Sequence, residues 1–333
     1  MKRRCSGLSC VLAIEKPVGM SSHDVVNLCR RVFGSTRVGH CGTLDPLAAG
    51  VLIVCIGPST RLENYIVGHA KSYDFSISFG CSTTTDDAGG DILKQSAVPE
   101  EFKNFDFANE AVASIVGIQM QVPPAYSAIK VDGKKACSEA RKGNNLKLKA
   151  REVEIVSAKL LGIEQRDLEA STEVIWNLST CVTSGTYIRS IARDLGEKLA
   201  CPAHISSLVR TKCSSVGIES CLKISEIESL LSDEHNKLED ALLFARKNCI
   251  DPASILGFEI LMVDESILKK IENGNAIDIS CILGSSAAHP HNFEDGKKYL
   301  LADENLVYAI YEFIAESAQL KSCCKFSIGV LRG

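Results

Sequence analysis

The chain has 333 residues, of which 45% are hydrophobic and 23% are charged, and its formal net charge is −4. These values are ordinary for a soluble globular protein, and the longest apolar runs, such as residues 51–56, are too short to cross a bilayer. The start of the chain carries basic residues, but Glu15 and Lys16 interrupt its apolar stretch, which argues against a secretory signal. We therefore expect a cytoplasmic protein without a membrane anchor.

The first third of the chain predicts strands and one clear helix. Residues 11–15 form an apolar strand candidate, and a helix with apolar residues at helical spacing should begin at Ser21 or Ser22 and stop at Gly34. Residues 50–57 are a continuous apolar run, which is typical of a buried strand. Residues 71–80 alternate between aromatic or aliphatic and polar side chains, as a half-buried strand does. A polar, solvated loop over 82–92 and a helix over about 99–116 should follow.

The middle of the chain continues in the same mixed manner. Val131-Asp132-Gly133 is a hairpin-like turn signal. Strands are expected over 152–163 and 173–183, and residues 185–199 show the spacing of an amphipathic helix. Strands and helices alternate irregularly, without a repeating strand–helix–strand pattern, so the predicted fold class is α+β.

The composition changes after about residue 250, where the chain becomes acidic and short strand-like pieces appear at 280–284, 298–302 and 306–314. We place a domain boundary there, which gives domains over 1–250 and 251–333. The charges are distributed accordingly. Residues 1–214 carry 26 Lys and Arg against 22 Asp and Glu, a net charge of +4, and residues 215–333 carry 11 against 19, a net charge of −8.

The most basic segment is residues 134–151, with seven Lys or Arg and one Glu. A polyanion would therefore meet the first part of the chain rather than the last. A solvated helix and loop is the plain structural alternative for this segment. The fifteen cysteines are scattered, without a CxxC pair, so we expect reduced thiols in apolar surroundings rather than disulfides or a zinc site.

Four residues could carry chemistry, and each also has an ordinary structural explanation. Asp45 precedes a proline and could simply start a turn. His40 could be a loop histidine, and Tyr73 could be part of the core beside Phe75. Arg189 falls in the first turn of the predicted helix, where the helix dipole disfavours a cation, so it suggests a specific anionic partner. The pattern alone does not decide between these interpretations.

Six motifs in a consistent order extend the interpretation: KPVGMSSHDVV, GHCGTLDPLAAGVL, KSYDFSISFG, PPAYSAIKVDGKK, SGTYIRSIARDLG and HISSLVRT. Together, over residues 11–215, they resemble the bacterial tRNA pseudouridine-55 synthases of the TruB family. The resemblance implies the pseudouridine synthase fold, a mixed and mainly antiparallel sheet flanked by helices. The tail is loosely similar to the small β-rich PUA-type RNA-binding domain that many members carry.

The resemblance also implies an activity: isomerisation of uridine 55 in the T loop of tRNA to pseudouridine, with no cofactor or metal and no protein partner, in a monomer. Asp45 matches the catalytic aspartate, and Arg189 matches the arginine that pairs with it. Tyr73 matches the tyrosine that stacks on the flipped uracil. The expected substrate-binding residues are His40, Leu208, Lys16, Pro17, Lys134, Lys135, Arg141 and Lys142. Cys41, Cys137 and Val209 depart from the usual motifs without touching the catalytic set.

Two other functional classes remain open. A non-catalytic tRNA-folding chaperone of the same fold would be expected to lack Asp45 or Arg189, and both are present. A glycoside- or nucleoside-cleaving hydrolase usually needs two positioned acids, and only the Asp86-Asp87 pair, in the loop predicted to be solvated, offers a second one.

Overall fold

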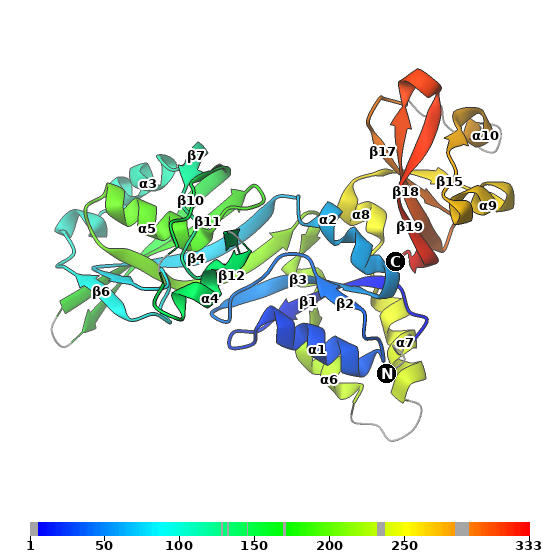
Figure 1. Cartoon of the computed structure of the whole chain (residues 1–333). Coiled ribbons are helices and arrows are strands. Elements are labelled where there is room, and N and C mark those ends of the chain that lie inside the picture. The colour runs from blue at the N-terminus through cyan, green and yellow to red at the C-terminus, as the bar shows by residue number, and fades with distance from the viewer. Residues whose placement is uncertain are drawn as a thin grey trace. The chain divides into compact units, whose positions relative to one another are not determined.

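The computed structural model describes residues 6–127, 129–131, 133–144, 146–168, 171–231, 237–283 and 293–333. Contacts between Cα atoms divide the chain into two units (Figure 1). The first unit comprises residues 1–45, 51–67 and 214–333, and the second comprises residues 46–50 and 68–213. In the described part of the chain, no helix combines the length and apolar composition that a membrane span requires.

In the first unit, strands pair in the order β14-β1-β3, with β2 paired to β3. Its core is apolar: residues 51–56 of β3 are fully buried, and α1 contributes Val25 and Leu28. The elements before the second unit are β1 (Cys10–Lys16), α1 (Ser22–Val32), β2 (Val38–His40), β3 (Ala48–Ile56, whose first three residues belong to the second unit), η1 (Gly57–Leu62) and α2 (Glu63–Ile66). Those that follow are β13 (Val216–Gly217), η3 (Ile218–Ser220), β14 (Leu222–Lys223), α6 (Ile224–Ser229), α7 (Lys237–Asn248) and α8 (Pro252–Leu256).

The end of the first unit is rich in β-structure. Its sheet has the order β15-β17-β18-β19-β16 around a core that includes Tyr299 and Tyr311. The elements are β15 (Glu259–Met262), α9 (Glu265–Asn273), β16 (Ile277–Asp278), α10 (Ile279–Leu283), β17 (Lys298–Ala302), β18 (Leu306–Ile314), η4 (Ala315–Ser317) and β19 (Gln319–Leu331).

The second unit is built on the strand order β12-β4-β11-β10-β7, in which every neighbouring pair is antiparallel. Trp176 lies at the centre of its aromatic core, against Phe79 and Phe102. The elements are β4 (Lys71–Phe79), β5 (Cys81–Thr83), β6 (Ile92–Gln95), η2 (Glu100–Lys103), α3 (Phe105–Ala113), β7 (Gly117–Gln121), β8 (Lys130–Val131), β9 (Lys134–Lys135), α4 (Ala136–Ala140), β10 (Arg151–Leu168), β11 (Ser171–Val182), α5 (Ile188–Lys198) and β12 (Ala203–Cys213).

The first residues of β3 reach β12 within the second unit. Ala48 and Gly50 pair in parallel with Leu208 and Arg210. Gly50 has a φ of +103°, and a Cβ at this position would lie 2.2 Å from the carbonyl oxygen of Arg210. Only glycine allows this backbone conformation and this close approach, which explains the glycine in the apolar motif after Asp45.

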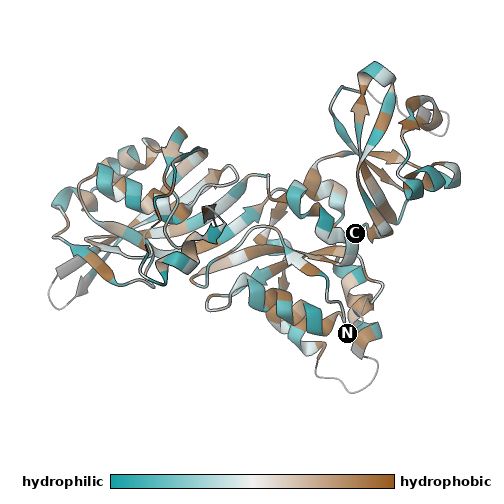
Figure 2. Ribbon diagram, viewed as in Figure 1, coloured by the Kyte–Doolittle hydropathy of each residue, from teal (hydrophilic) through white to brown (hydrophobic). Residues whose placement is uncertain are grey.

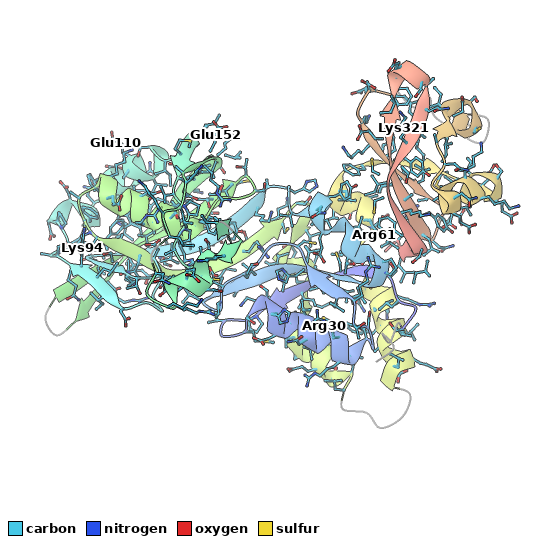
Figure 3. The ribbon with its side chains drawn as sticks, in the orientation of Figure 1. Arg30, Arg61, Lys94, Glu110, Glu152 and Lys321 are labelled. Atoms are coloured by element: carbon cyan, nitrogen blue, oxygen red, sulfur yellow. The ribbon has the colours of Figure 1, made fainter. Side chains whose placement is uncertain are left out.

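The side chains are buried or exposed as the sequence patterns predict. The ribbons of α5 and α9 carry both hydrophobic and hydrophilic residues (Figure 2), since one face of each helix is buried. Charged side chains project from the surface, for example Lys94 on β6 and Lys321 on β19 (Figure 3). The described cysteines are free thiols, as expected.

The predicted fold class, a mixed and mainly antiparallel α+β protein with a β-rich C-terminal part, is confirmed. Three local predictions were wrong. The helix expected over 99–116 is divided into η2 and α3, because the Asn104 side chain accepts a hydrogen bond from the Phe107 amide and starts a new helix. The loop expected over 82–92 is shorter, because Ser82, Thr83 and Ile92 belong to the β5–β6 pair. Residues 280–283 of the strand expected at 280–284 belong to the helix α10, which Asp278 starts by accepting two hydrogen bonds from Ser280, and residue 284 lies outside the described residues.

Candidate functional site

Asp45 lies in the first unit and is half-buried. It directly follows Leu44, whose backbone is hydrogen-bonded to the helix α1. Ser22, the first residue of α1, is 2% exposed. Its hydroxyl donates a hydrogen bond to the Leu44 carbonyl (3.0 Å) and accepts one from the Leu44 amide (2.8 Å). Both polar groups of the preceding residue are therefore satisfied by one side chain, which limits the movement of the backbone that carries the Asp45 carboxylate.

Three further residues of the predicted set belong to the same unit. Lys16 is fully buried, and its ammonium donates to the carbonyls of Pro17 (2.8 Å) and Met20 (2.6 Å). It thus closes the turn that leads into α1, while Pro17 is exposed. His40 ends β2, opposite Val54 of β3, and is half-buried.

Tyr73 and Leu208 lie on adjacent strands of the second unit. Tyr73 is a buried residue of β4 with Arg210 of β12 as its cross-strand partner, and Leu208 of β12 is opposite Phe75. The alternation predicted for residues 71–80 is confirmed, since Tyr73, Phe75 and Ile77 share the buried face. Tyr73 and Leu208 therefore come from neighbouring positions of one sheet.

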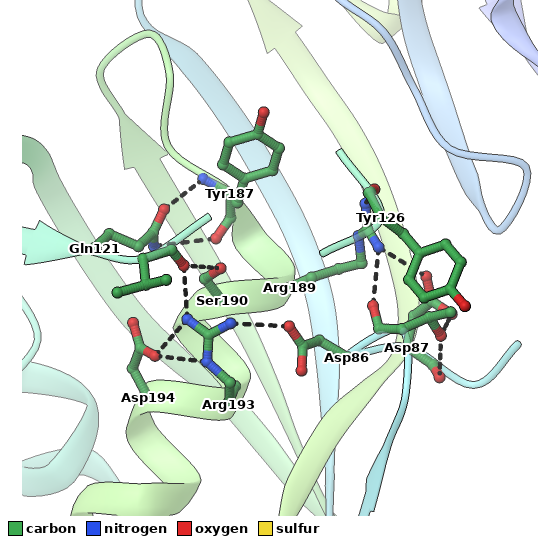
Figure 4. Close-up of polar contacts among 11 residues, drawn as sticks. Asp86, Asp87, Gln121, Tyr126, Tyr187, Arg189, Ser190, Arg193 and Asp194 are labelled. Atoms are coloured by element: carbon green, nitrogen blue, oxygen red, sulfur yellow. Dashed lines mark hydrogen bonds and ion pairs between the residues drawn. The ribbon is translucent and has the colours of Figure 1, made fainter. Parts of the chain in front are cut away.

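Arg189 is 5% exposed and lies in the first turn of α5, so the surface alternative is wrong (Figure 4). Its Nη1 donates to the carbonyl oxygen of Thr85 (2.8 Å) and lies 3.5 Å from Oδ2 of Asp87. Its Nη2 donates to the carbonyl oxygen of Tyr126 (2.9 Å). The guanidinium is thus oriented by acceptors from two separate segments, which is an arrangement that suits its planar, forked donors.

The expectation that Asp86 and Asp87 lie in a solvated loop was wrong. Asp87 is 8% exposed, and its carboxylate also accepts hydrogen bonds from the Gly89 amide (3.0 Å) and the Thr85 hydroxyl (2.6 Å). Asp86 pairs with Arg193 on α5 at 3.0 Å. Burial raises the pKa of Asp86, and the positive charge of Arg193 opposes that rise. Asp87 is therefore buried and Asp86 half-buried, because arginines of α5 compensate their charge.

Within the basic segment 134–151, some side chains are exposed and one forms an internal ion pair. Lys134 in β9 and Arg141 after α4 are exposed, whereas the ammonium of Lys142 lies 2.9 Å from Oε1 of Glu139. Lys135 belongs to β9, which pairs with β8 as the hairpin signal predicted. Asp132, within that predicted turn, lies outside the described residues.

Two buried charged residues were missed as site candidates. Asp87 was considered only as a solvated acid, and Arg210 was not considered at all, although it is 1% exposed and lies opposite Tyr73. A signal for Arg210 exists in the sequence: it occupies an alternating position after Leu208, where a buried strand normally carries an apolar residue. The pairing of Arg189 with Asp45 stays a prediction.

The chain is similar to known proteins over most of its length. Residues 30–188 match the model described as TruB family pseudouridylate synthase (N terminal domain), and residues 189–254 match the tRNA pseudouridylate synthase B C-terminal domain. The tRNA pseudouridine synthase B of Geobacillus thermodenitrificans is 33% identical over 302 residues, which cover 90% of this chain and 93% of that protein. The protein of the same name from Clostridioides difficile is 36% identical over 274 residues, covering 80% of this chain and 84% of its own.

Solved structures share the fold at lower sequence identity. A chain of the Cbf5-Nop10-Gar1 complex superposes with a TM-score of 0.64 at 19% identity, covering 98% of this chain and 85% of that one. A chain of an H/ACA RNP bound to a substrate RNA containing 2′-deoxyuridine gives 0.61 at 17% identity, covering 96% and 85%. These likenesses concern the fold alone.

Proposed function

Because the chain belongs to the TruB family of pseudouridine synthases, we propose that it isomerises uridine 55 in the T loop of tRNA to pseudouridine. The observation that carries this proposal is the similarity to proteins named tRNA pseudouridine synthase B along nearly their whole length. Asp45 lies within residues 30–188, which match the TruB family N-terminal domain model, and Leu44 before it is anchored to α1 through Ser22.

In this function, Asp45 is the nucleophile. The bond between N1 of uracil and C1′ of the ribose breaks, and its electron pair leaves with the base. The carboxylate either captures the positive charge that develops on the sugar by bonding to C1′, or takes the C2′ proton to give a glycal and returns that proton when C1′ bonds to C5. The base then turns and C5 bonds to C1′ while any bond between the Asp45 carboxylate and C1′ breaks, which frees the carboxylate, so that product and substrate have the same atoms. This chemistry requires no oxidant, reductant or cofactor.

The other residues bind and position the nucleotide. Tyr73 stacks on the extruded uracil and accepts the proton that leaves C5, while N1 gains a proton. Arg189 keeps the Asp45 carboxylate ionised, and Leu208 lines the base pocket. His40 fills the space that the base leaves in the RNA, which offsets part of the few kcal/mol that base flipping costs. Lys16 and Pro17 support the catalytic loop, and Lys134, Lys135, Arg141 and Lys142 contact T-arm phosphates.

The proposal also covers the oligomeric state, the location and the domain organisation of the protein. It acts as a monomer in the cytoplasm on tRNA alone, with residues 1–250 as the catalytic domain and 251–333 as a PUA-like appendage. The division is supported by the β-rich sheet that begins at Glu259. The hydrolase alternative is disfavoured, because Asp86 and Asp87, the second acids considered for it, are each paired with an arginine.

The decisive experiment is carbodiimide-adduct primer extension on an unmodified tRNA transcript, which is needed because pseudouridine and uridine have the same mass. Wild-type protein should produce a stop in the T loop, and Asp45→Ala should produce none while binding tRNA with similar affinity. Asp106→Ala, an exposed aspartate on α3, serves as the matched control and should behave as wild type. Tight binding without any stop by the wild-type protein would instead support the folding chaperone.

A further inference from the structure

Two arginines on one face of α5 hold the same two segments of the second unit. Arg189 and Arg193 are four residues apart, so their side chains lie one above the other along the helix. The segments are the turn at residues 83–87, which follows β5, and residues 121–126, which follow β7. Arg189 contacts both, as described above, and Figure 4 shows that Arg193 does the same one turn further along the helix.

All three nitrogens of the Arg193 guanidinium donate hydrogen bonds. Its Nη1 donates to Oδ2 of Asp86 in the turn (3.0 Å), and its Nη2 donates to the carbonyl oxygen of Val122 (2.7 Å). Nε and Nη2 also donate to Oδ1 of Asp194 at 3.0 and 2.8 Å, which fixes the plane of the group. Val122 receives a second hydrogen bond, from the Ser190 hydroxyl (3.0 Å). Arg193 is therefore a bridge between two segments that are distant in sequence.

Within the turn at 83–87, Asp86 lies between the two residues that contact Arg189, so the position of Asp86 determines theirs. Asp86 adopts a left-handed backbone conformation, with a φ of 60°, which is strained for most residues and acceptable for Asp or Asn. Its carbonyl accepts a hydrogen bond from the Ile205 amide (3.1 Å), which connects the turn to β12. The residues on either side, Thr85 and Asp87, are the ones that contact Arg189.

Residues 121–126 are also held in place, by hydrogen bonds and by two prolines. Gln121 exchanges two hydrogen bonds with the backbone of Tyr187, just before α5 begins. Val122 is followed by the buried residues Pro123 and Pro124, whose rings fix their φ angles. Tyr126, which contacts Arg189, comes two residues later. Displacing Val122 would therefore displace the carbonyl that Arg189 uses.

We infer that Arg193 is a positioning residue for the isomerisation: it holds Asp86 and Val122 so that Thr85, Asp87 and Tyr126 orient the guanidinium of Arg189. The inference rests on the proposed function, in which Arg189 acts on the catalytic carboxylate. Arg193 itself does not touch the substrate. Its loss should therefore slow the chemical step while leaving tRNA affinity unchanged.

The test compares Arg193→Met, Arg193→Lys and Asp86→Asn in single-turnover pseudouridine formation with the full-length protein. A displacement of about 1 Å at a reacting group costs up to about 100-fold in rate, so we expect Arg193→Met to be about 10- to 100-fold slower. Its Kd for tRNA should stay within about threefold of wild type. Arg193→Lys should recover part of the rate, because one ammonium reaches either Asp86 or Val122 but not both.

The remaining variants separate positioning from folding. Asp86→Asn keeps the left-handed turn and removes the charge, so its rate should fall, and combining it with Arg193→Met should add little further loss. Lys198→Met, which removes a hydrogen bond to Ser114 from the same helix, is the control and should keep the wild-type rate. Far-UV circular dichroism and melting curves confirm folding at the assay temperature.

Two outcomes would overturn the inference. A folded Arg193→Met variant with a rate within twofold of wild type would show that Arg189 is positioned without it. An increase in Kd at an unchanged rate would make Arg193 an RNA contact instead. A wild-type protein that forms no pseudouridine is a different result, because it would contradict the proposed function before any Arg193 variant is compared.

Discussion

Arg189 shows how a single residue is fixed in one orientation. Its guanidinium is met by two backbone carbonyls and one carboxylate, from Thr85, Tyr126 and Asp87. The Asp87 carboxylate is itself held by hydrogen bonds from the Thr85 hydroxyl and the Gly89 amide. A buried cation is tolerated here because it is paired and its donors are satisfied.

We expect Arg189→Lys to be severely impaired in turnover, by about 100-fold or more, because an ammonium cannot reproduce the planar fork. The initial rate of pseudouridine formation at saturating tRNA measures this. Arg166→Lys, an exposed arginine on β10, is the matched control and should retain wild-type turnover. Near-normal turnover of Arg189→Lys would argue against a bidentate role.

At the scale of the element, α1 begins at a local capping signal and is hydrogen-bonded to the loop that carries Asp45. Ser21 is the N-cap: its hydroxyl accepts a hydrogen bond from the Asp24 amide (3.2 Å), and the Ser21 amide donates to the Asp24 carboxylate (2.8 Å). The neighbouring Ser22 points the other way, into the protein, and holds Leu44. One serine therefore starts the helix, and the next attaches the helix to the residue before Asp45.

Ser22→Ala should lower the free energy of unfolding by about 1–3 kcal/mol, because the buried amide and carbonyl of Leu44 both lose their partner. It should also slow turnover, since Asp45 follows Leu44. Urea denaturation and single-turnover assays measure the two effects. Ser254→Ala, an exposed serine in the first turn of α8 that bonds to Asp251, should change neither. A Ser22→Ala variant with wild-type stability would show that the hydrogen bonds to Leu44 are dispensable.

The distribution of charge is a property of the whole molecule. The basic residues of 1–214 and the acidic residues of 215–333 give an overall charge of −4, which by itself would argue against an RNA-binding protein. Electrostatic attraction depends on where the charges lie, so a polyanion meets the basic part first. Among the basic residues of 134–142, Lys134 and Arg141 are exposed, while Lys142 is paired with Glu139.

Replacing Lys134 and Arg141 with alanine should weaken tRNA binding and make it less sensitive to salt. The slope of log K against log salt should decrease by about one for each phosphate group that the protein no longer neutralises. Lys321→Ala, an exposed lysine in the acidic C-terminal part (Figure 3), should leave the slope unchanged. An unaltered slope in the double variant would remove the basic segment from the RNA interface.

The sequence alone predicted the features that depend on neighbouring residues. The alternation of β4, the start of α1 at Ser21 or Ser22 and the buried strand β3 follow from the spacing of nearby residues, and the structure confirms them. The ordered motifs were sufficient to indicate the family. The same motifs singled out Asp45, Tyr73 and Arg189, because each of these residues stands at a fixed position within one motif.

Only the tertiary structure decided how the polar residues are paired. Asp86 and Asp87 look like a solvated acidic loop in the sequence, but Asp87 is buried and Asp86 half-buried, because arginines more than a hundred positions later compensate their charge. Likewise, nothing near Ser22 in the sequence indicates that it holds Leu44, 22 residues away. Local patterns fix which face of an element is buried. The partner of a buried charge or hydroxyl is fixed only when distant segments meet, because its desolvation must be compensated by whatever group the fold brings there.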